Sequence, residues 1–400
     1  MVTDLVSRPS PVTPEILINR ARDMIPRLIE RGGAADRAGR VPDETVAEMK
    51  DAGFFRVLQP RRYGGFEMNP RAFYETQMAL AEGCMSTAWI YGVLGVHPWQ
   101  LALFDVRAQN DVWGNDDSTI IASTYMPVGK VEPVKEGFRL SGRWSFSSGC
   151  EHAQWMLLGG MVPPAGDETA PHYRTFLLPD SDYRIIKNWD VIGLKATGSH
   201  DIAVDGAFVP EYRTHKTRDD SRAARPGLAV NSAPLYTLPF AQVFVRAVST
   251  SCVGGLQGAL NVFRASASKQ VSRNFLGRTA ADPVVQSVAA ETASMIDLMK
   301  LALVRNFNEM MDYAIRGQQA PVDDRLLFRF QSAQVVDICA DLVSKLLKSC
   351  GGSGIYNSHP LVRYFLDIHA GRAHVANNQG PVARNFGGVL LGEPNQDPTV

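Results

Sequence analysis

Two histidines near the C-terminal end of the chain are the side chains best suited to acid–base chemistry. They are His369 and His374, in the segment RYFLDIHAGRAHVAN from Arg363 to Asn377. An imidazole titrates near neutral pH and can therefore give or take a proton under physiological conditions. The two are five residues apart, about 140° around a helix, which does not suit the i, i+4 histidine pair of a helical zinc site. The segment therefore predicts proton chemistry by histidine, without a catalytic carboxylate and without a metal.

A serine-rich strand and turn is the second candidate. In RWSFSSGCEHAQW, Phe146 is followed by Ser147, Ser148 and Gly149. Hydroxyl and backbone N–H groups on such an edge suit hydrogen bonds to a flat heteroaromatic ring, although an ordinary β-turn explains the same residues. The earlier run IASTYMP contains Ser123 and Tyr125, which on their own indicate only a half-buried strand.

The remaining candidates come from four short segments. His97 in LGVHPWQ and Trp89 in STAWIYG could line a cavity, and core packing explains a tryptophan equally well. Arg273 in SKQVSRNFLGR has the planar guanidinium that suits phosphate, although a solvated helix residue is the alternative. The run KSCGGSGIY does not follow a strand and lacks the G-x-G-x-x-G spacing, so it predicts no dinucleotide fold.

Composition narrows the class of protein. The 400 residues are 45% hydrophobic, as in a folded globular chain, and 41 basic residues balance 41 acidic ones. This balance excludes a general attraction to nucleic acid or anionic membrane. Five scattered cysteines indicate reduced thiols rather than a disulfide framework. With no signal sequence and no apolar run of about eighteen residues, we expect a cytoplasmic protein with small-molecule or protein partners.

The elements that must position these residues fall into three blocks. Helical periodicity covers Pro14 to about Thr119, short β-branched and aromatic runs follow to about Arg225, and helical periodicity returns from Phe240. We therefore predict an α+β protein with an N-terminal helical domain (1–118), a β domain (119–225) and a C-terminal helical bundle (226–400). The long helices of the bundle are expected at 243–270, 283–316, 324–349 and 359–378.

This order of domains, together with the serine turn and the glycine-rich run, resembles the acyl-CoA dehydrogenase superfamily over nearly the whole chain. The resemblance implies a flavin between the β domain and the bundle, with Ser147 facing ring atom N5. It implies that the flavin is contacted by a set of matching positions, namely Trp89, Ser123, Tyr125, Phe146, Ser147, Ser148, Arg273, Phe275, Gly351, Gly352, His374 and Val375. Among these, Arg273 and Phe275 would hold the flavin phosphate, and the two glycines would approach a cofactor of a neighbouring subunit.

The catalytic glutamate of the dehydrogenases is missing from this sequence. Val375 and Ala376 stand at its position, and the alternative location on an earlier helix, Val248 to Gly258, also has no carboxylate. Abstraction of an α-proton from an acyl thioester needs a strong, positioned base. The chain therefore resembles the flavin-dependent monooxygenases of this fold, the oxygenase components of two-component phenol hydroxylases. The nearest resemblance is to the bacterial hydroxylase of the secosteroid phenol (3-HSA) in cholesterol and steroid breakdown.

The resemblance implies ortho-hydroxylation of a phenol to a catechol with dioxygen and reduced FMN or FAD. A separate NADH-dependent reductase would supply the flavin, and the subunit would form a homotetramer. His97 or His374 would deprotonate the phenol, and Ser148 would hydrogen-bond the activated oxygen. Three alternatives remain, namely an acyl-CoA dehydrogenase-like oxidoreductase, a related hydroxylase of a smaller phenol or heteroaromatic, and a flavin-free assembly subunit.

Overall fold

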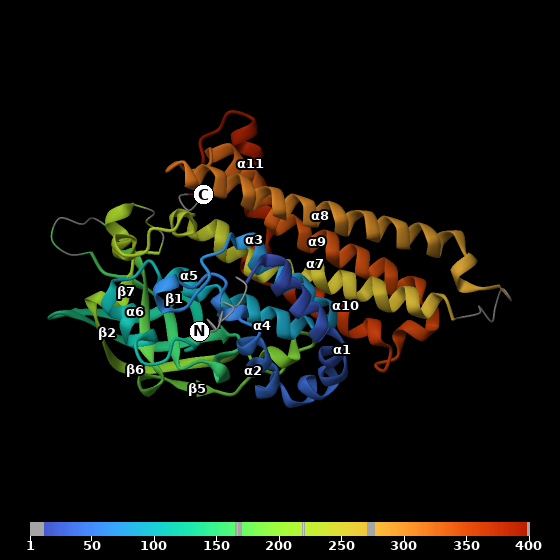
Figure 1. Ribbon diagram of the computed structural model, residues 1–400, viewed down its shortest axis with the longest axis horizontal. Coiled ribbons are helices and arrows are strands. Elements are labelled where there is room, and N and C mark those ends of the chain that lie inside the picture. Colours follow the sequence, from blue (N-terminus) through green and yellow to red (C-terminus); the bar gives the residue numbers. More distant parts are fainter. Residues whose placement is uncertain are drawn as a thin grey trace, which may run out of the picture.

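A computed structural model describes residues 12–164, 166, 170–217, 219, 221–269 and 277–397. Figure 1 shows a β domain on one side and long C-terminal helices that extend away from it, with N-terminal helices packed along both. The predicted α+β order of helices, sheet and helical bundle is confirmed. One cluster of buried apolar residues runs through all three parts, so the predicted domain boundaries stay a prediction.

The N-terminal part contains the helices α1 (Pro14–Ala38), α2 (Asp43–Asp51), α3 (Pro70–Gly83), α4 (Met85–Gly95), α5 (His97–Leu101) and α6 (Val106–Trp113). Helix α2 begins directly after Pro42 with two acidic residues, which favour the positive end of the helix dipole. Every residue of α4 is buried. A helix that is apolar all round lies inside a fold, and α4 packs against α3, α7 and β1.

The β domain is one sheet with the strand order β5-β6-β2-β1-β3-β4-β7 within the described residues. Its strands are β1 (Ile121–Val134), β2 (Gly137–Ser147), β3 (Trp155–Val162), β4 (His172–Pro179), β5 (Arg184–Ile186), β6 (His200–Pro210) and β7 (Thr214–His215). Neighbouring strands are antiparallel except β1 and β3, which are parallel. The pairing of β2 with β6 shifts between Trp144 and Ser147, and this bulge changes the direction of the side chains that follow.

The bundle is built from α7 (Phe240–Ala267), α8 (Pro283–Ile315), α9 (Val322–Ser349), α10 (Pro360–Arg372) and α11 (Gln379–Leu390). By length and composition α7 could cross a membrane, but 89% of its apolar window is buried, as expected of the central helix on which α3, α4, α9 and α10 pack. The predicted helix 359–378 is wrong at its end. Helix α10 stops at Arg372, and His374 caps a separate 3₁₀ turn, Val375–Asn377.

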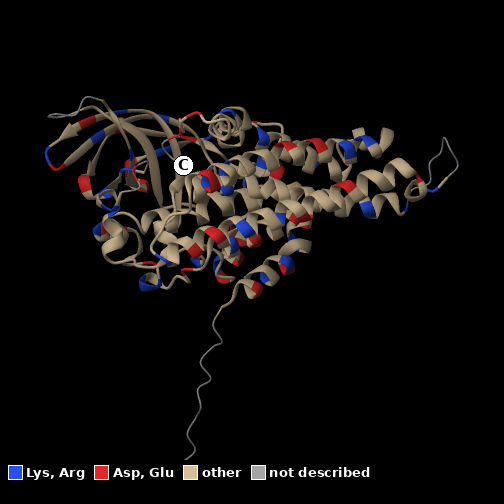
Figure 2. Ribbon diagram, turned by 90° about the horizontal axis from the view of Figure 1, so that it is seen from above, with Lys and Arg blue, Asp and Glu red and all other residues tan. Residues whose placement is uncertain are grey.

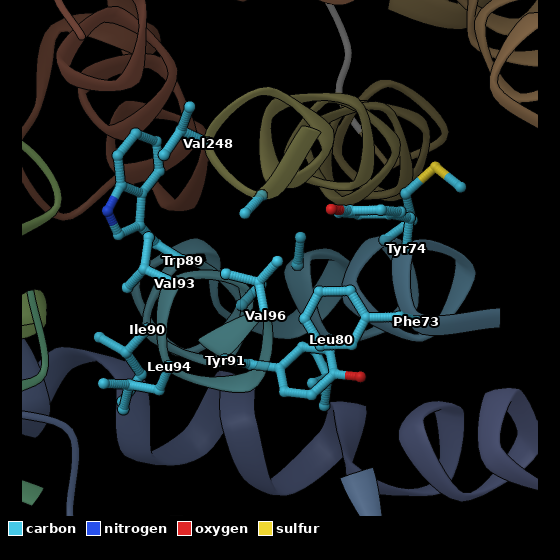
Figure 3. Close-up of a cluster of buried hydrophobic side chains, with 14 of the residues drawn as sticks. Phe73, Tyr74, Leu80, Trp89, Ile90, Tyr91, Val93, Leu94, Val96 and Val248 are labelled. Carbon is cyan, nitrogen blue, oxygen red and sulfur yellow. The ribbon is translucent and has the colours of Figure 1, made fainter. Parts of the chain in front are cut away.

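The contact between α4 and α7 forms the inner wall of the bundle. Figure 3 shows Trp89 and Val93 of α4 directed toward Val248 of α7, with Ile90 and Leu94 on another side of α4. Charged residues, in contrast, are spread over the outside of helices and strands with both signs interspersed (Figure 2). The apolar wall is therefore the part of the fold that can position a buried site.

Candidate active site

His97 and the turn that begins at His374 both contact one face of α7. The ring of His97 stacks on Phe244, with centroids 6.3 Å apart and planes 15° apart. Asn377, three residues after His374, donates a hydrogen bond of 2.9 Å to the carbonyl of Val248. Phe244 and Val248 are four residues apart, about one helical turn. The candidate site therefore lies along one stripe of α7, with α4, α5 and the end of α10 around it.

His97 is the first residue of α5 and is completely buried. Its Nδ1 lies 3.2 Å from the hydroxyl oxygen of Tyr125, and its Nε2 has no hydrogen-bond partner among the described residues. Burial lowers the pKa of His97 to about 3, because an imidazolium loses its hydration in the interior. The ring is therefore neutral, and its Nε2 is a buried polar atom without a partner among the described residues.

Tyr125 lies on β1 beside His97. Its hydroxyl donates to Oε1 of Gln100, and its ring meets Phe240 and Phe244 edge to face, with centroids 5.4 and 4.8 Å away. Ser123, two residues earlier, shares this face of the strand. The hydroxyl of Tyr125 is thus engaged with α5, and the predicted contacts of Ser123 and Tyr125 with the flavin edge stay predictions.

His374 lies in the turn after α10. Its Nδ1 accepts a hydrogen bond of 3.1 Å from the backbone N–H of Ala376, so the neutral ring carries its proton on Nε2. Burial, with a smaller contribution from Arg329, lowers the pKa of His374 to about 4. Arg329 also donates to the carbonyl of Ala376 over 2.9 Å. The turn is thereby held on both sides of Ala376, and Nε2–H of His374 is a fixed donor.

Trp89 and Ser148 connect α4 to the β domain. The indole Nε1 of Trp89 donates to Oγ of Ser148 over 3.2 Å, and its ring meets His374 edge to face at 5.8 Å. Oγ of Ser148 lies 2.7 Å from Oγ of Ser199, which lies 2.7 Å from Oγ1 of Thr197. The sequence from Asp190 to Ile202 predicts a segment that supports the β domain, with some contact to the flavin edge. Its TGS run supplies the hydroxyl of Ser199 that bonds Ser148 and the hydroxyl of Thr197 that bonds Ser199.

Phe146 and Ser147 point in different directions at the bulge. Phe146 is 64% exposed and adopts φ +67°, a strained backbone region for a bulky residue, and its ring meets Trp189 edge to face at 6.1 Å. Ser147 is completely buried, and its hydroxyl donates to Sδ of Met156 over 3.3 Å. The hydroxyl of Ser147 thus points into the β domain, and its predicted contact with ring atom N5 stays a prediction.

The other predicted positions lie apart from this group or outside the described residues. Val375 follows His374 and is 82% exposed. Gly351 and Gly352 are exposed in the 3₁₀ turn after α9, at the end of the bundle far from the β domain (Figure 1). An added Cβ at either glycine would meet no atom within 4 Å. Arg273 and Phe275, the predicted phosphate ligands, lie outside the described residues.

The segment from Arg363 to Asn377, which is predicted to act without a catalytic carboxylate, does contain one carboxylate, Asp367. This residue is buried on α10, and its Oδ1 accepts a hydrogen bond of 2.6 Å from the backbone N–H of Leu194. Burial raises the pKa of Asp367 to about 6, against the opposing effect of Arg363. Asp367 thus holds α10 to a loop of the β domain, and the dehydrogenase position at Val375 and Ala376 still lacks an acid.

Replacing Asp367 by asparagine should stabilise the protein at neutral and higher pH. The folded-state pKa near 6 exceeds the ordinary value of 3.8, so ionisation costs folding free energy as the pH rises from about 4 through 6. In Asp367→Asn the amide oxygen would keep the acceptor for Leu194 without this cost. We expect a gain of roughly 3 kcal/mol at pH 8 and about half of that at pH 5, measured by urea unfolding. Asp341→Asn, at an exposed site, is the control. An equal gain in unfolding free energy at both pH values, or the same gain in the control, would contradict the role of Asp367 ionisation.

Comparison with known proteins adds to this geometry. Residues 15–113 match the acyl-CoA dehydrogenase N-terminal domain family, and residues 247–379 match the acyl-CoA dehydrogenase C-terminal domain family. The oxygenase subunit HsaA of a flavin-dependent monooxygenase from Rhodococcus jostii RHA1 is 35% identical over 384 residues, which cover 96% of this chain and 100% of the relative.

Two further relatives extend the comparison. The crystal structure of the 3-HSA hydroxylase from Rhodococcus sp. RHA1 superposes with a TM-score of 0.91 at 35% identity, covering 96% of this chain and 98% of that one. The oxygenase component of an FADH(2)-dependent resorcinol hydroxylase from Rhizobium sp. MTP-10005 is 30% identical over 396 residues, 96% of each chain.

Proposed function

Because the chain belongs to the flavin-dependent monooxygenase oxygenase subunits of the acyl-CoA dehydrogenase fold, we propose that it ortho-hydroxylates a phenol to a catechol. The relatives support a phenolic substrate, and the full-length similarity to 3-HSA hydroxylases favours the secosteroid phenol of steroid catabolism. A smaller phenol is the alternative, favoured by the resorcinol hydroxylase. Reduced flavin, when bound, supplies the electrons that activate dioxygen.

One observation supports this chemistry most directly: the site has two neutral histidines, His97 against α7 and His374 in the turn that Asn377 ties to α7, and no carboxylate at the dehydrogenase position. Nε2 of His97 has no partner among the described residues and can accept a hydrogen bond from the phenol hydroxyl, so that the proton moves to Nε2 as the phenol oxygen loses electron density in the reaction. Nε2–H of His374 can donate to a developing negative charge on oxygen. Trp89 and Phe244 contribute apolar walls that keep water away from the reacting atoms.

The described residues fit a flat ring between the β domain and the turn after α10. Phe146 is strained and exposed on the sheet side, and Val375 is exposed beside His374. We propose that these two residues contact the isoalloxazine, with Ser148 and the backbone of the serine turn near its polar edge. Either reduced FMN or reduced FAD fits these contacts. The relatives are oxygenase subunits or components, which supports a separate NADH-dependent reductase as partner.

The test supplies the purified protein with chemically reduced FMN or FAD, ¹⁸O₂ and a panel of phenols that includes 3-HSA and resorcinol. Mass spectrometry should find a catechol that contains one ¹⁸O atom. Reduction of a dye by an acyl-CoA thioester without reductase would favour the dehydrogenase alternative. If no reduced flavin binds in a titration, the protein is not an oxygenase.

We also propose that the protein is a homotetramer. Four large apolar side chains of α8 are more than half exposed in the single chain, namely Val284, Leu298, Leu301 and Ile315. Helix α11 has no buried residue, and Leu390 and Leu391 at its end are 68% and 87% exposed. Apolar surface of this extent marks a protein contact. A monomeric mass in light scattering would contradict the proposal.

A further inference from the structure

His97 is joined through Tyr125 to Gln100 by two hydrogen bonds. Nδ1 of His97 lies 3.2 Å from the Tyr125 hydroxyl oxygen, and that hydroxyl donates to Oε1 of Gln100. Gln100 comes three residues after His97 on α5, so the two side chains share a face of the helix, whereas Tyr125 comes from β1. The hydroxyl of Tyr125 therefore lies between His97 and Gln100, so the orientation of the Gln100 amide can determine the hydrogen bond at Nδ1 of His97.

The single proton of the tyrosine hydroxyl decides where the proton of His97 lies. Because Tyr125 donates its proton to Gln100, its oxygen can only accept a hydrogen bond from His97. Nδ1 must then carry the ring proton. A neutral imidazole has one N–H, so Nε2 keeps a free lone pair. This is the nitrogen that has no partner among the described residues.

The orientation of the Gln100 amide controls this result. If the amide were reversed, its NH₂ group would donate to Tyr125, the tyrosine proton would go to Nδ1, and Nε2 of His97 would carry the proton. The amide Nε2 of Gln100 lies 3.5 Å from Oγ1 of Thr217, which contacts the hydroxyl of Thr175 and lies 3.4 Å from Nδ1 of His215. Gln100 is 1% exposed, and both ends of its amide are engaged by the protein.

We propose that Gln100 and Tyr125 are positioning residues that hold His97 as its Nδ1–H tautomer, with the Nε2 lone pair directed to accept a proton from the phenol. The proposal rests on the function proposed above. It also separates the roles of the two histidines. Because Nδ1 of His374 accepts a backbone N–H, its Nε2 is a donor, and the base is His97.

The surroundings of His97 contain few groups that could change its protonation. On β1 the titratable neighbour is Tyr125, whose pKa burial raises well above the usual value and whose carbonyl accepts from the hydroxyl of Tyr173 on β4 over 2.9 Å. On α7 the ring of Phe244 stacks on His97, and the ring of Phe240 contacts Tyr125. Burial alone accounts for the lowered pKa of His97, so the hydrogen bond from its Nδ1 is what selects the tautomer.

Nuclear magnetic resonance of the full-length protein labelled with ¹⁵N in the histidine rings tests the tautomer without turnover. The ¹⁵N shift distinguishes a protonated ring nitrogen from a bare one. We expect a histidine in the Nδ1–H form whose signals disappear in His97→Gln, and an Nε2–H form that disappears in His374→Gln. A wild-type His97 with its proton on Nε2 would overturn the proposal. If the tautomer is as expected but no phenol is hydroxylated, the proposed function fails while the positioning of His97 stands.

Two variants measure the contribution of the positioning residues. Tyr125→Phe keeps the ring between Phe240 and Phe244 but removes the partner of Nδ1, and Gln100→Met removes the acceptor that orients the hydroxyl. Both should lower kcat by about 10–100-fold, leave KM for the phenol within about threefold, and weaken the Nδ1–H signal. Tyr63→Phe, whose hydroxyl bonds Asn110 away from the site, is the matched control. An unchanged tautomer in Tyr125→Phe would overturn the proposal whatever its activity.

Discussion

Replacing His97 by alanine is expected to lower catechol formation by about 10²–10⁴-fold while reduced flavin continues to be oxidised. Alanine has no ring to stack on Phe244. It also lacks the unpartnered Nε2 of His97 that would accept the phenol proton. Without that acceptor, a neutral phenol keeps its proton and is a poor nucleophile. Oxygen that is reduced at the flavin is then lost as hydrogen peroxide, so the ratio of catechol to oxygen consumed should fall together with the rate.

The base role of His97 can be separated from a structural effect of the substitution. Phenols that are already ionised at the assay pH do not need a base, and they should recover most of the lost rate in His97→Ala. His369→Ala is the matched control, because its Nε2 contacts Ser344 on α9 at 3.2 Å, away from the stripe on α7. Equal losses for ionised and neutral phenols would show that His97 holds the site together rather than accepting a proton.

The fold is predictable where periodicity alone decides it. The two-residue alternation of the strand runs and the apolar spacing of α7, α8 and α9 come from local sequence, and their bounds differ from the predicted ones by a few residues. Apolar periodicity predicts that His374 lies on a helix. It carries no information on the hydrogen bond that the imidazole of His374 accepts from the N–H of Ala376, and this bond forms where the helix has already ended. Such a cap is a side-chain contact, and capping by histidine has no strong sequence signal.

The orientation of site residues is harder to predict than their identity. A period of two places Phe146 and Ser148 on one face, but the bulge in β2 exposes Phe146 and buries both serines. Gln100 carries no sequence signal, because its importance lies in a contact with Tyr125 from another element. The roles that depend on tertiary contacts between elements far apart in sequence are therefore the ones that sequence patterns cannot supply.

The close approach of α4 to α7 predicts the largest effect on stability. At Gly92 an added Cβ would lie 2.0 Å from Nε2 of Gln77 and 2.6 Å from the carbonyl oxygen of Ala247. That Nε2 donates to the carbonyls of Ala88 and Ala247 over 3.0 and 2.7 Å, so one amide of α3 joins α4 to α7. A methyl group at residue 92 must move this amide or separate the two helices.

We therefore expect Gly92→Ala to lower the free energy of unfolding by about 3–5 kcal/mol, since overpacking and unsatisfied buried hydrogen-bonding groups each cost about 1–3 kcal/mol. Gly33→Ala on α1 is the control, because its nearest neighbour would be Nη1 of Arg37 at 3.7 Å, and it should be neutral or stabilising by up to about 1 kcal/mol. Urea unfolding of both variants measures the difference. Since Trp89 lies three residues before Gly92 on α4, separation of the helices would also move Trp89 away from Ser148. Equal stability of the two variants would mean that the contact between α4 and α7 can relax to accept the methyl group.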